Sequence, residues 1–232
     1  MKHHTPQSRP PFWVAPAFTL VELLVVIAII SVMLTMGTLG LKNLSKASGV
    51  SAGLPIAEAI FAEARAMAVG KGVRTRVLVH GQNDRDDEFH RERFLRYMVV
   101  QYVSDDKDTP DDLDDDEWTT ASRGSSLPKG VYFIKRLSET SAITLETVSV
   151  ELPGKSETTC YVYEYNAEGM IASPEADGND VPRFVVQAAT LPPGADEPVA
   201  TSGNAKNLGG FVIWRSGRTS LFRHPEQIEP SS

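Results

Sequence analysis

The feature that most constrains this chain is a 24-residue apolar run close to its N-terminus. From Phe18 to Leu41 the sequence reads FTLVELLVVIAIISVMLTMGTLGL and contains one charged residue, Glu22. As an α-helix this run would be about 36 Å long, enough to cross a hydrocarbon core of about 30 Å. A carboxylate just inside such a run is costly unless a cation pairs with it. We therefore expect one membrane pass and a specific partner for Glu22.

The remaining sequence is hydrophilic, and its composition excludes several classes of protein. The 232 residues are 41% apolar and 23% charged, with a formal net charge of -7, which excludes a disordered chain and a basic nucleic-acid scaffold. The single cysteine, Cys160, excludes an intrachain disulfide framework and a Cys-rich zinc module. Because it lies in an expected strand, we interpret it as a buried structural thiol.

Catalytic motifs are absent from the sequence. There is no Gly-x-Ser-x-Gly elbow, phosphate-binding loop or His-Glu-x-x-His zinc motif, and the five histidines show no ligand spacing. We therefore expect a protein that is not an enzyme and has no cofactor.

Three interpretations of the apolar run compete. A cleaved secretory signal has its small-residue cleavage site after a short apolar core, whereas here Ala15-Pro16-Ala17 precedes a long one. A plain signal anchor fits the length of the run but leaves Glu22 without a role. The third interpretation accounts for both features and depends on the residues around the start of the run.

The segment Ala17–Val26 (AFTLVELLVV) resembles the type III signal of type IV pilins and type II secretion pseudopilins. The resemblance implies that a prepilin peptidase cuts between Ala17 and Phe18 and that Phe18 is then N-methylated. Glu22, the fifth residue of the mature chain, would pair with the N-terminal amine of a neighbouring subunit. Such a pair neutralises both charges where water is scarce. The chain departs from the family at Ala17, where glycine is usual.

The helical pattern continues beyond the apolar run. Small and apolar residues recur every three or four positions as far as Ala68, while two glycines and Pro55 predict a kink or short break at 49–55. The glycines at 70 and 72 predict the end of the helix. The expected segments are a leader at 1–17, a transmembrane helix at 18–41 and an amphipathic continuation at 42–70.

Beyond Gly72 the apolar pattern changes to a period of two, which indicates strands. No helical run intervenes, so we expect an antiparallel β head at 73–224, followed by a tail at 225–232. Gly210–Phe222 is typical of a hairpin with its turn at Ser216-Gly217. The expected strands are Val73–His80, Arg93–Val103, Val131–Lys135, Thr158–Tyr165, Arg183–Ala188, Phe211–Arg215 and Arg218–Phe222.

The junction between helix and head resembles that of GspH/FimT-like minor pseudopilins. Their Ala-Arg-x-x-Ala helix end matches Arg65 and Ala68, and a terminal hairpin with Gly-Arg after its turn also recurs in that group. The fold class that we expect is therefore α+β and pilin-like. A long N-terminal helix, with a transmembrane half and an amphipathic half, would pack on an antiparallel β-sheet head.

The acidic loop at 104–117 is a candidate metal site. Nine of the residues from Asp105 to Glu117 are acidic, and Ca²⁺ prefers clustered carboxylates. The EF-hand pattern is absent, because no glycine stands where its loop must turn, and we favour a solvated loop over a metal site. The weak calcium candidates are Asp111, Asp112, Asp114, Asp115 and Asp116.

The C-terminal hairpin is a candidate nucleic-acid contact through Arg215, Arg218 and Arg223. In FimT-like pilins a basic C-terminal region is associated with DNA uptake. Phosphate binding tolerates little nearby negative charge, and without the two cations of the leader the net charge becomes -7 - 2 = -9. Ser220 also stands where those relatives tend to have an arginine. We therefore favour ordinary exposed arginines and no nucleic-acid partner.

The resemblance implies a structural function, that of a minor pseudopilin assembling into a type II secretion or type IV pilus-like filament. Implied partners are a prepilin peptidase, other pseudopilins or pilins through the N-terminal helix, and an inner-membrane assembly platform. The implied location is the bacterial inner membrane, crossed once, with the head in the periplasm. Two alternatives stay open: a minor pilin that binds DNA during uptake, and an uncleaved single-pass anchor that presents a β domain.

Overall fold

The structure is a computed structural model that describes residues 19–84, 86–105, 116–152, 155–175, 180–200 and 205–222, without the side chains at 32, 34–48, 105, 155 and 156. By its internal contacts the chain divides into two units, Met1–Lys42 and Asn43–Ser232. Each unit is described by itself, and the second is called the head below.

Helix α1 (Leu20–Lys71) is continuous, and the break expected around Pro55 does not occur. Proline costs one backbone hydrogen bond, here to the carbonyl of Ser51, and Ser51 is exposed to water. The nearby glycines serve close packing. A Cβ at Gly49 would lie 3.0 Å from a methyl group of Val131, and one at Gly53 would lie 3.2 Å from Cδ of Pro128. These glycines therefore let the helix approach the chain around 128–131.

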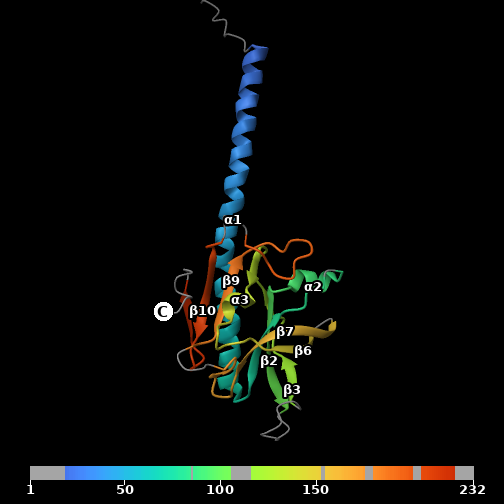
Figure 1. The fold of residues 1–232 in the computed structure, drawn as a ribbon, viewed down its shortest axis with the longest axis vertical. Helices are drawn as coiled ribbons and strands as arrows, with labels where there is room; N and C mark the ends of the chain where they lie inside the picture. The colour runs from blue at the N-terminus through green and yellow to red at the C-terminus, as the bar shows by residue number, and fades with distance from the viewer. Residues whose placement is uncertain are drawn as a thin grey trace, which may run out of the picture. The chain divides into compact units, whose positions relative to one another are not determined.

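Two antiparallel sheets make up most of the head. In the larger sheet of the described residues, the strand order is β3 (Glu117–Thr120), β2 (Tyr97–Asp105), β1 (Thr75–His80), β7 (Lys155–Tyr165) and β6 (Thr147–Leu152), with β4 (Ser125–Ser126) on β2 and β8 (Ile171–Ser173) on β7. In the smaller sheet the order is β11 (Thr219–Phe222), β10 (Leu208–Ile213), β9 (Arg183–Ala188) and β5 (Val131–Phe133). Two short helices, α2 (Glu88–Arg93) and α3 (Lys135–Ser138), follow β1 and β5 (Figure 1).

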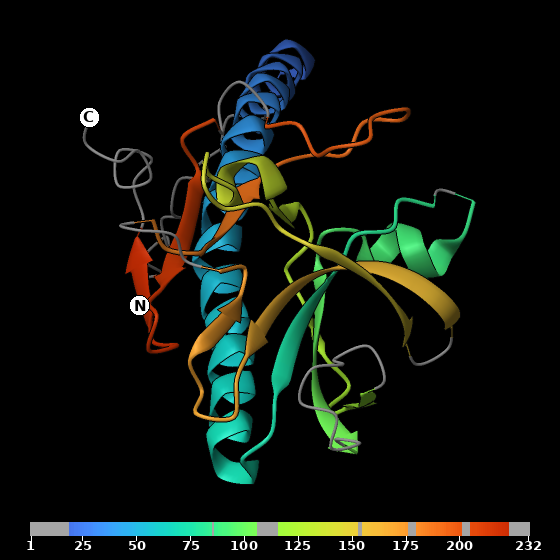
Figure 2. The ribbon, with the colours of Figure 1, turned by 60° about the horizontal axis from the view of Figure 1, so that its bottom comes forward.

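The core of the head forms around the second half of α1, which contributes buried side chains at spacings of three and four from Val50 to Ala68. Phe61 lies at its centre, with ring centroids 5.1 Å from Tyr163, 5.2 Å from Phe184 and 5.0 Å from Phe211. Tyr163 belongs to the larger sheet, and the two phenylalanines belong to the smaller one. Figure 2 shows strands on both sides of this part of α1. The helix is thus the element that joins the two sheets.

The expected fold class is wrong. No helix in the described part of the chain is both long enough and apolar enough to cross a membrane. The β part also differs, because two antiparallel sheets replace the single sheet that we expected. The structure is a curled antiparallel β-protein, and in the part of the chain that the structure describes α1 is long but does not provide the long apolar N-terminal helix that we expected.

The sequence pattern identified the strands that lie in the interior of the head, such as β1, β9 and β10, in which nearly every residue is buried. The hairpin at Gly210–Phe222 is confirmed, because β10 and β11 pair with Ile213 opposite Thr219. Strands β3, β4, β6 and β8 were missed. Arg93, expected at the start of a strand, ends α2 instead. Strands β4 and β8 are only two and three residues long, and β3 has no buried residue, so these three carry a weak signal. Strand β6 does alternate, with Val150 and Leu152 buried, and its pattern was overlooked.

Candidate functional site

The start of α1 holds the first candidate site, around Glu22. Thr19 caps the helix, because its hydroxyl oxygen accepts a hydrogen bond from the backbone N–H of Glu22 at 3.2 Å, and its carbonyl accepts one from Leu23 at 3.2 Å. The Glu22 side chain is exposed in the first turn, where a negative charge interacts favourably with the helix dipole. Thr19 was not identified from the sequence, although Thr-x-x-Glu is a helix-start pattern.

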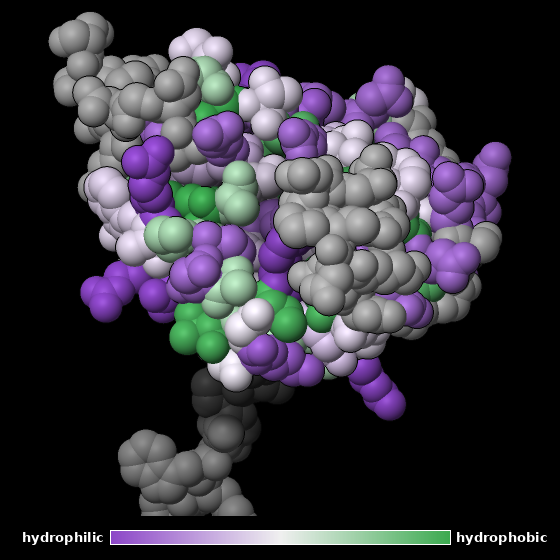
Figure 3. Space-filling model, turned by 90° about the horizontal axis from the view of Figure 1, so that it is seen from below, coloured by the Kyte–Doolittle hydropathy of each residue, from purple (hydrophilic) through white to green (hydrophobic). Residues whose placement is uncertain are grey.

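The helix that follows Glu22 exposes apolar side chains on every side. Ten large apolar residues from Leu20 to Met33 are between 46% and 83% exposed. Several of them are consecutive, so they point in all directions around a helix with 3.6 residues per turn. The face of the head in Figure 3 differs, because hydrophobic residues there form small groups among hydrophilic ones. The largest exposed apolar surface described in this chain is therefore the start of α1.

A second cluster joins α1 to the turn between β10 and β11. Arg65 Nε donates a hydrogen bond to the carbonyl of Ser216 at 3.1 Å. Nearby, the hydroxyl of Thr219 donates to the carboxylate of Glu58 at 3.1 Å. In the sequence Arg65 stood out only as part of the Ala-Arg-x-x-Ala pattern, and the structure shows that it holds the hairpin turn.

The arginines considered for nucleic acid lie on this same turn. Arg215 and Arg218 are exposed, and Arg218 lines a small cavity with Arg65. Arg223 lies outside the described residues. Ser220, where an arginine would strengthen phosphate binding, accepts a hydrogen bond from the indole of Trp214 at 2.8 Å. Among the described residues, the turn between β10 and β11 therefore carries two exposed cations, Arg215 and Arg218.

The acidic loop is described only at its two ends, residues 104–105 and 116–117. The candidates Asp111, Asp112, Asp114 and Asp115 lie outside the described residues, as do the leader 1–17, the cleavage pair Ala17 and Phe18, and the tail 225–232. Asp116 is nearly buried and pairs with Arg74 at 2.6 Å, and the same arginine pairs with Glu164 at 3.0 Å. A guanidinium at this distance competes with any cation for the carboxylate. Within the described residues no group of three or more potential ligands could hold a metal ion.

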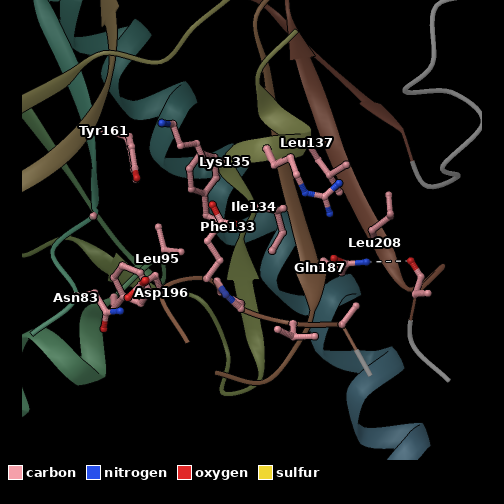
Figure 4. A pocket seen from close by; sticks show the side chains of 18 residues that line it. Asn83, Leu95, Phe133, Ile134, Lys135, Leu137, Tyr161, Gln187, Asp196 and Leu208 are labelled. Atoms are coloured by element: carbon pink, nitrogen blue, oxygen red, sulfur yellow. Dashed lines mark hydrogen bonds between the residues drawn. The ribbon is translucent and has the colours of Figure 1, made fainter. Parts of the chain in front are cut away.

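A cavity in the head has a volume of about 750 Å³. Figure 4 shows its lining residues, which come from β5, α3, β7, β9 and β10 and from the segment around Asp196. Phe133, Leu95, Ile134 and Leu208 provide apolar walls. A volume of this size suits a small ligand or the side chains of a partner segment.

The polar groups around this cavity carry charges of both signs. Lys135 Nζ lies 3.5 Å from the carboxylate of Glu139 and 5.4 Å from the centroid of the Tyr161 ring. Arg136 and Glu197 are exposed at the cavity, and neither forms an ion pair within the described part of the chain. The cavity therefore favours neither an anion nor a cation.

Cys160 is fully buried in β7, as the sequence indicated. Burial raises the pKa of its thiol to about 12, so very little thiolate exists at neutral pH. Because the thiolate is the reactive form, this environment is that of a structural cysteine.

No protein-family model matches this chain, and neither the curated proteins nor the solved structures contain a match to it.

Proposed function

We propose that this protein is a structural subunit of a type II secretion or type IV pilus-like filament, as the minor pseudopilins are. The observation that supports the proposal is the start of α1, where a capped turn with Glu22 is followed by a helix that exposes apolar side chains on every side. A helix of this kind is stable only when other apolar surfaces cover it. Neighbouring helices of the same kind would provide that cover.

Glu22 would set the axial position of one subunit against the next. Among apolar helices its carboxylate loses water, and an unpaired charge there costs several kcal/mol. Cleavage after Ala17 would create a free amine at Phe18 on each subunit. A carboxylate and an amine from adjacent subunits pair at only one axial offset, so the pair would define the register of the filament.

The proposal also assigns partners and a location. A prepilin peptidase would remove residues 1–17 and methylate Phe18, so this chain would be a substrate of an enzyme rather than an enzyme. Other pseudopilins and an inner-membrane assembly platform would contact the start of α1. The head would lie in the periplasm, beside the bacterial inner membrane.

Intact-mass analysis tests the processing step. The chain is produced in bacterial cells with and without a prepilin peptidase, and the protein is purified in detergent. We expect the peptidase to yield a chain that starts at Phe18 and carries one added methyl group. An Ala17→Gly variant, which restores the residue usual in the family, should be processed at least as fully. A chain that still starts at Met1 in the presence of the peptidase would contradict the proposal.

Site-specific photocrosslinking tests the assembly step. A photoreactive amino acid replaces Val25, and two differently tagged copies are co-produced with the peptidase. We expect crosslinked pairs of the two tags, and a Glu22→Gln variant should reduce their yield by about tenfold, because the amine loses its charged partner. Glu63→Gln, on the same helix within the head, is the control and should leave the yield unchanged. Equal yields from all three chains would rule out the role of Glu22.

A further inference from the structure

Two histidines form a buried pair on the outer face of the larger sheet. His80, at the end of β1, is fully buried, and His90, in α2, is 4% exposed. Nε2 of His80 and Nδ1 of His90 are 3.2 Å apart, so one of the two nitrogens carries the hydrogen of the bond and the other accepts it. The rings are nearly parallel, with centroids 5.2 Å apart.

This pair holds α2 against the sheet. His90 is the buried residue of this six-residue helix, and Phe89 beside it packs on an apolar cluster that includes Leu78, Val99 and Cys160. A helix of this length has little stability of its own, so its position depends on side-chain contacts. Loss of the histidine hydrogen bond would therefore weaken one of the few contacts that hold α2 against the sheet.

The surroundings of the pair compensate a positive charge only weakly, because a backbone hydrogen bond at Gln82, which raises the pKa of His80, has a smaller effect than burial, His90 and Arg93. In the described part of the chain, neither histidine forms an ion pair with a carboxylate. From α2, Arg93 adds a like charge, and burial together with His90 and Arg93 lowers the pKa of His80 to about 4. Opposite His80 on β7 stands Cys160, which is a neutral thiol.

The other titratable groups nearby are engaged elsewhere. Tyr97 at the start of β2 donates its hydroxyl to the carbonyl of Arg123 at 2.7 Å. In the loop before α2, Asp84 accepts hydrogen bonds from the N–H groups of Asp86 and Asp87, and Asp87 accepts one from Phe89 at 2.8 Å. These carboxylates stabilise the loop and the first turn of α2.

We propose that the His80–His90 pair is an acid-sensitive latch, which releases α2 and exposes the apolar cluster beneath it when His80 takes up a proton. In the closed form this proton places a charge in a buried site beside Arg93 and against the His90 ring. Release moves the His80 ring into water, where the proton is held at little cost.

The test uses Cys160, the only cysteine of the chain, as a reporter of α2 opening. The full-length chain in nonionic detergent reacts with 4,4′-dithiodipyridine between pH 7.5 and pH 5. Each rate is divided by that of the urea-unfolded chain at the same pH, which removes the intrinsic pH dependence of the thiol. With a pKa of 6.5 in the open form and about 4 in the closed form of His80, opening should increase about 30-fold across this range.

Variants separate the latch from general acid unfolding. The double variant His80→Gln with His90→Gln keeps two neutral side chains that can bond to each other, and its normalised rate should not change with pH. Glu92→Gln, exposed on the same helix, is the control and should keep the full increase. If the double variant does not fold, His90→Gln alone serves the comparison and should show a smaller increase than the wild-type chain.

Three outcomes would overturn the proposal. The first is a normalised rate in the wild-type chain that stays constant from pH 7.5 to pH 5. The second is an equal increase in the wild-type chain and the histidine variants. The third is a parallel loss of far-UV circular dichroism, which would mean that acid unfolds the whole head rather than releasing α2.

Discussion

Arg65 in α1 and Ser216 in the turn between β10 and β11 are joined by a hydrogen bond of 3.1 Å across 151 positions of sequence. The donor is the guanidinium Nε and the acceptor is a backbone carbonyl, so the bond depends on the path of the turn rather than on the side chain of Ser216. It ties the end of the head's central helix to the C-terminal hairpin.

Gly217→Ala should test how tightly this turn is packed. Gly217 has a φ of +73°, and a Cβ there would collide with the carbonyl oxygen of Gly169 and reach 3.0 Å from Cδ of Arg65. We expect a loss of about 3 kcal/mol in the free energy of unfolding, from backbone strain and displacement of the turn. Urea denaturation followed by tryptophan fluorescence measures it. Gly70→Ala is the matched control, because nothing lies within 4 Å of its Cβ. A loss of similar size at Gly70 would contradict this explanation.

Phe61→Ala should remove the centre of the core. Phe61 is fully buried against Tyr163, Phe184 and Phe211, so we expect a loss of about 4 kcal/mol from lost transfer free energy and the cavity left behind. Leu221→Ala, at a residue that is 46% exposed, should cost less than about 1 kcal/mol. The same denaturation experiment compares the two. Equal losses would show that the two sheets do not depend on Phe61.

The stability of the head should fall as the solution becomes more acidic. The pKa of His80 is about 4 in the folded state and 6.5 when exposed, so the unfolded chain takes up the proton first. The stability contribution is therefore complete above pH 6.5 and is lost as the pH falls from 6.5 to 4. Between pH 7 and pH 5 the loss should be about 2 kcal/mol. Urea denaturation at each pH measures it, and His80→Gln should flatten the dependence. A His80→Gln variant with an unchanged slope would assign the loss to other groups.

Calcium should not stabilise the protein through Asp116. The Asp116 carboxylate is paired with Arg74 at 2.6 Å and is only 5% exposed, so a cation would have to displace the guanidinium. Millimolar Ca²⁺ should change Tm by less than about 1 °C compared with Mg²⁺ at the same ionic strength. Asp116→Asn should lower the free energy of unfolding by about 1 kcal/mol with or without Ca²⁺, because Arg74 keeps only Glu164 as its partner. A clear rise in Tm with Ca²⁺ alone would show that the acidic loop binds the ion.

The sequence predicted elements best where a local pattern also met a buried face in the folded protein. The hairpin at Gly210–Phe222 is such a case, because its first strand, β10, is buried along almost its whole length. Pro55 illustrates the opposite case. Its intrinsic preference is to break a helix at a cost of about 3 kcal/mol, but Leu54 and Ala57 on either side of it are buried in the core. Burial of the helix face outweighs the local preference.

The candidate sites also differ in whether a local sequence pattern could reveal them. Glu22 stands out in the sequence because an acid is rare in an apolar run. The histidine pair had no such signal, since His80 and His90 are ten positions apart and meet only because α2 folds back over the end of β1. Arg65 likewise gained a role only when the C-terminal turn was placed beside it.

By itself, the sequence determined where apolar and charged residues concentrate, that one acid, Glu22, stands in the apolar run, and which segments have a period of two. These properties depend on neighbouring residues and are therefore visible in a linear pattern. Only the tertiary structure decided that the strands form two sheets around Phe61 and that α1 continues through Pro55. Such outcomes depend on contacts between residues far apart in the chain, whose energies no local pattern contains.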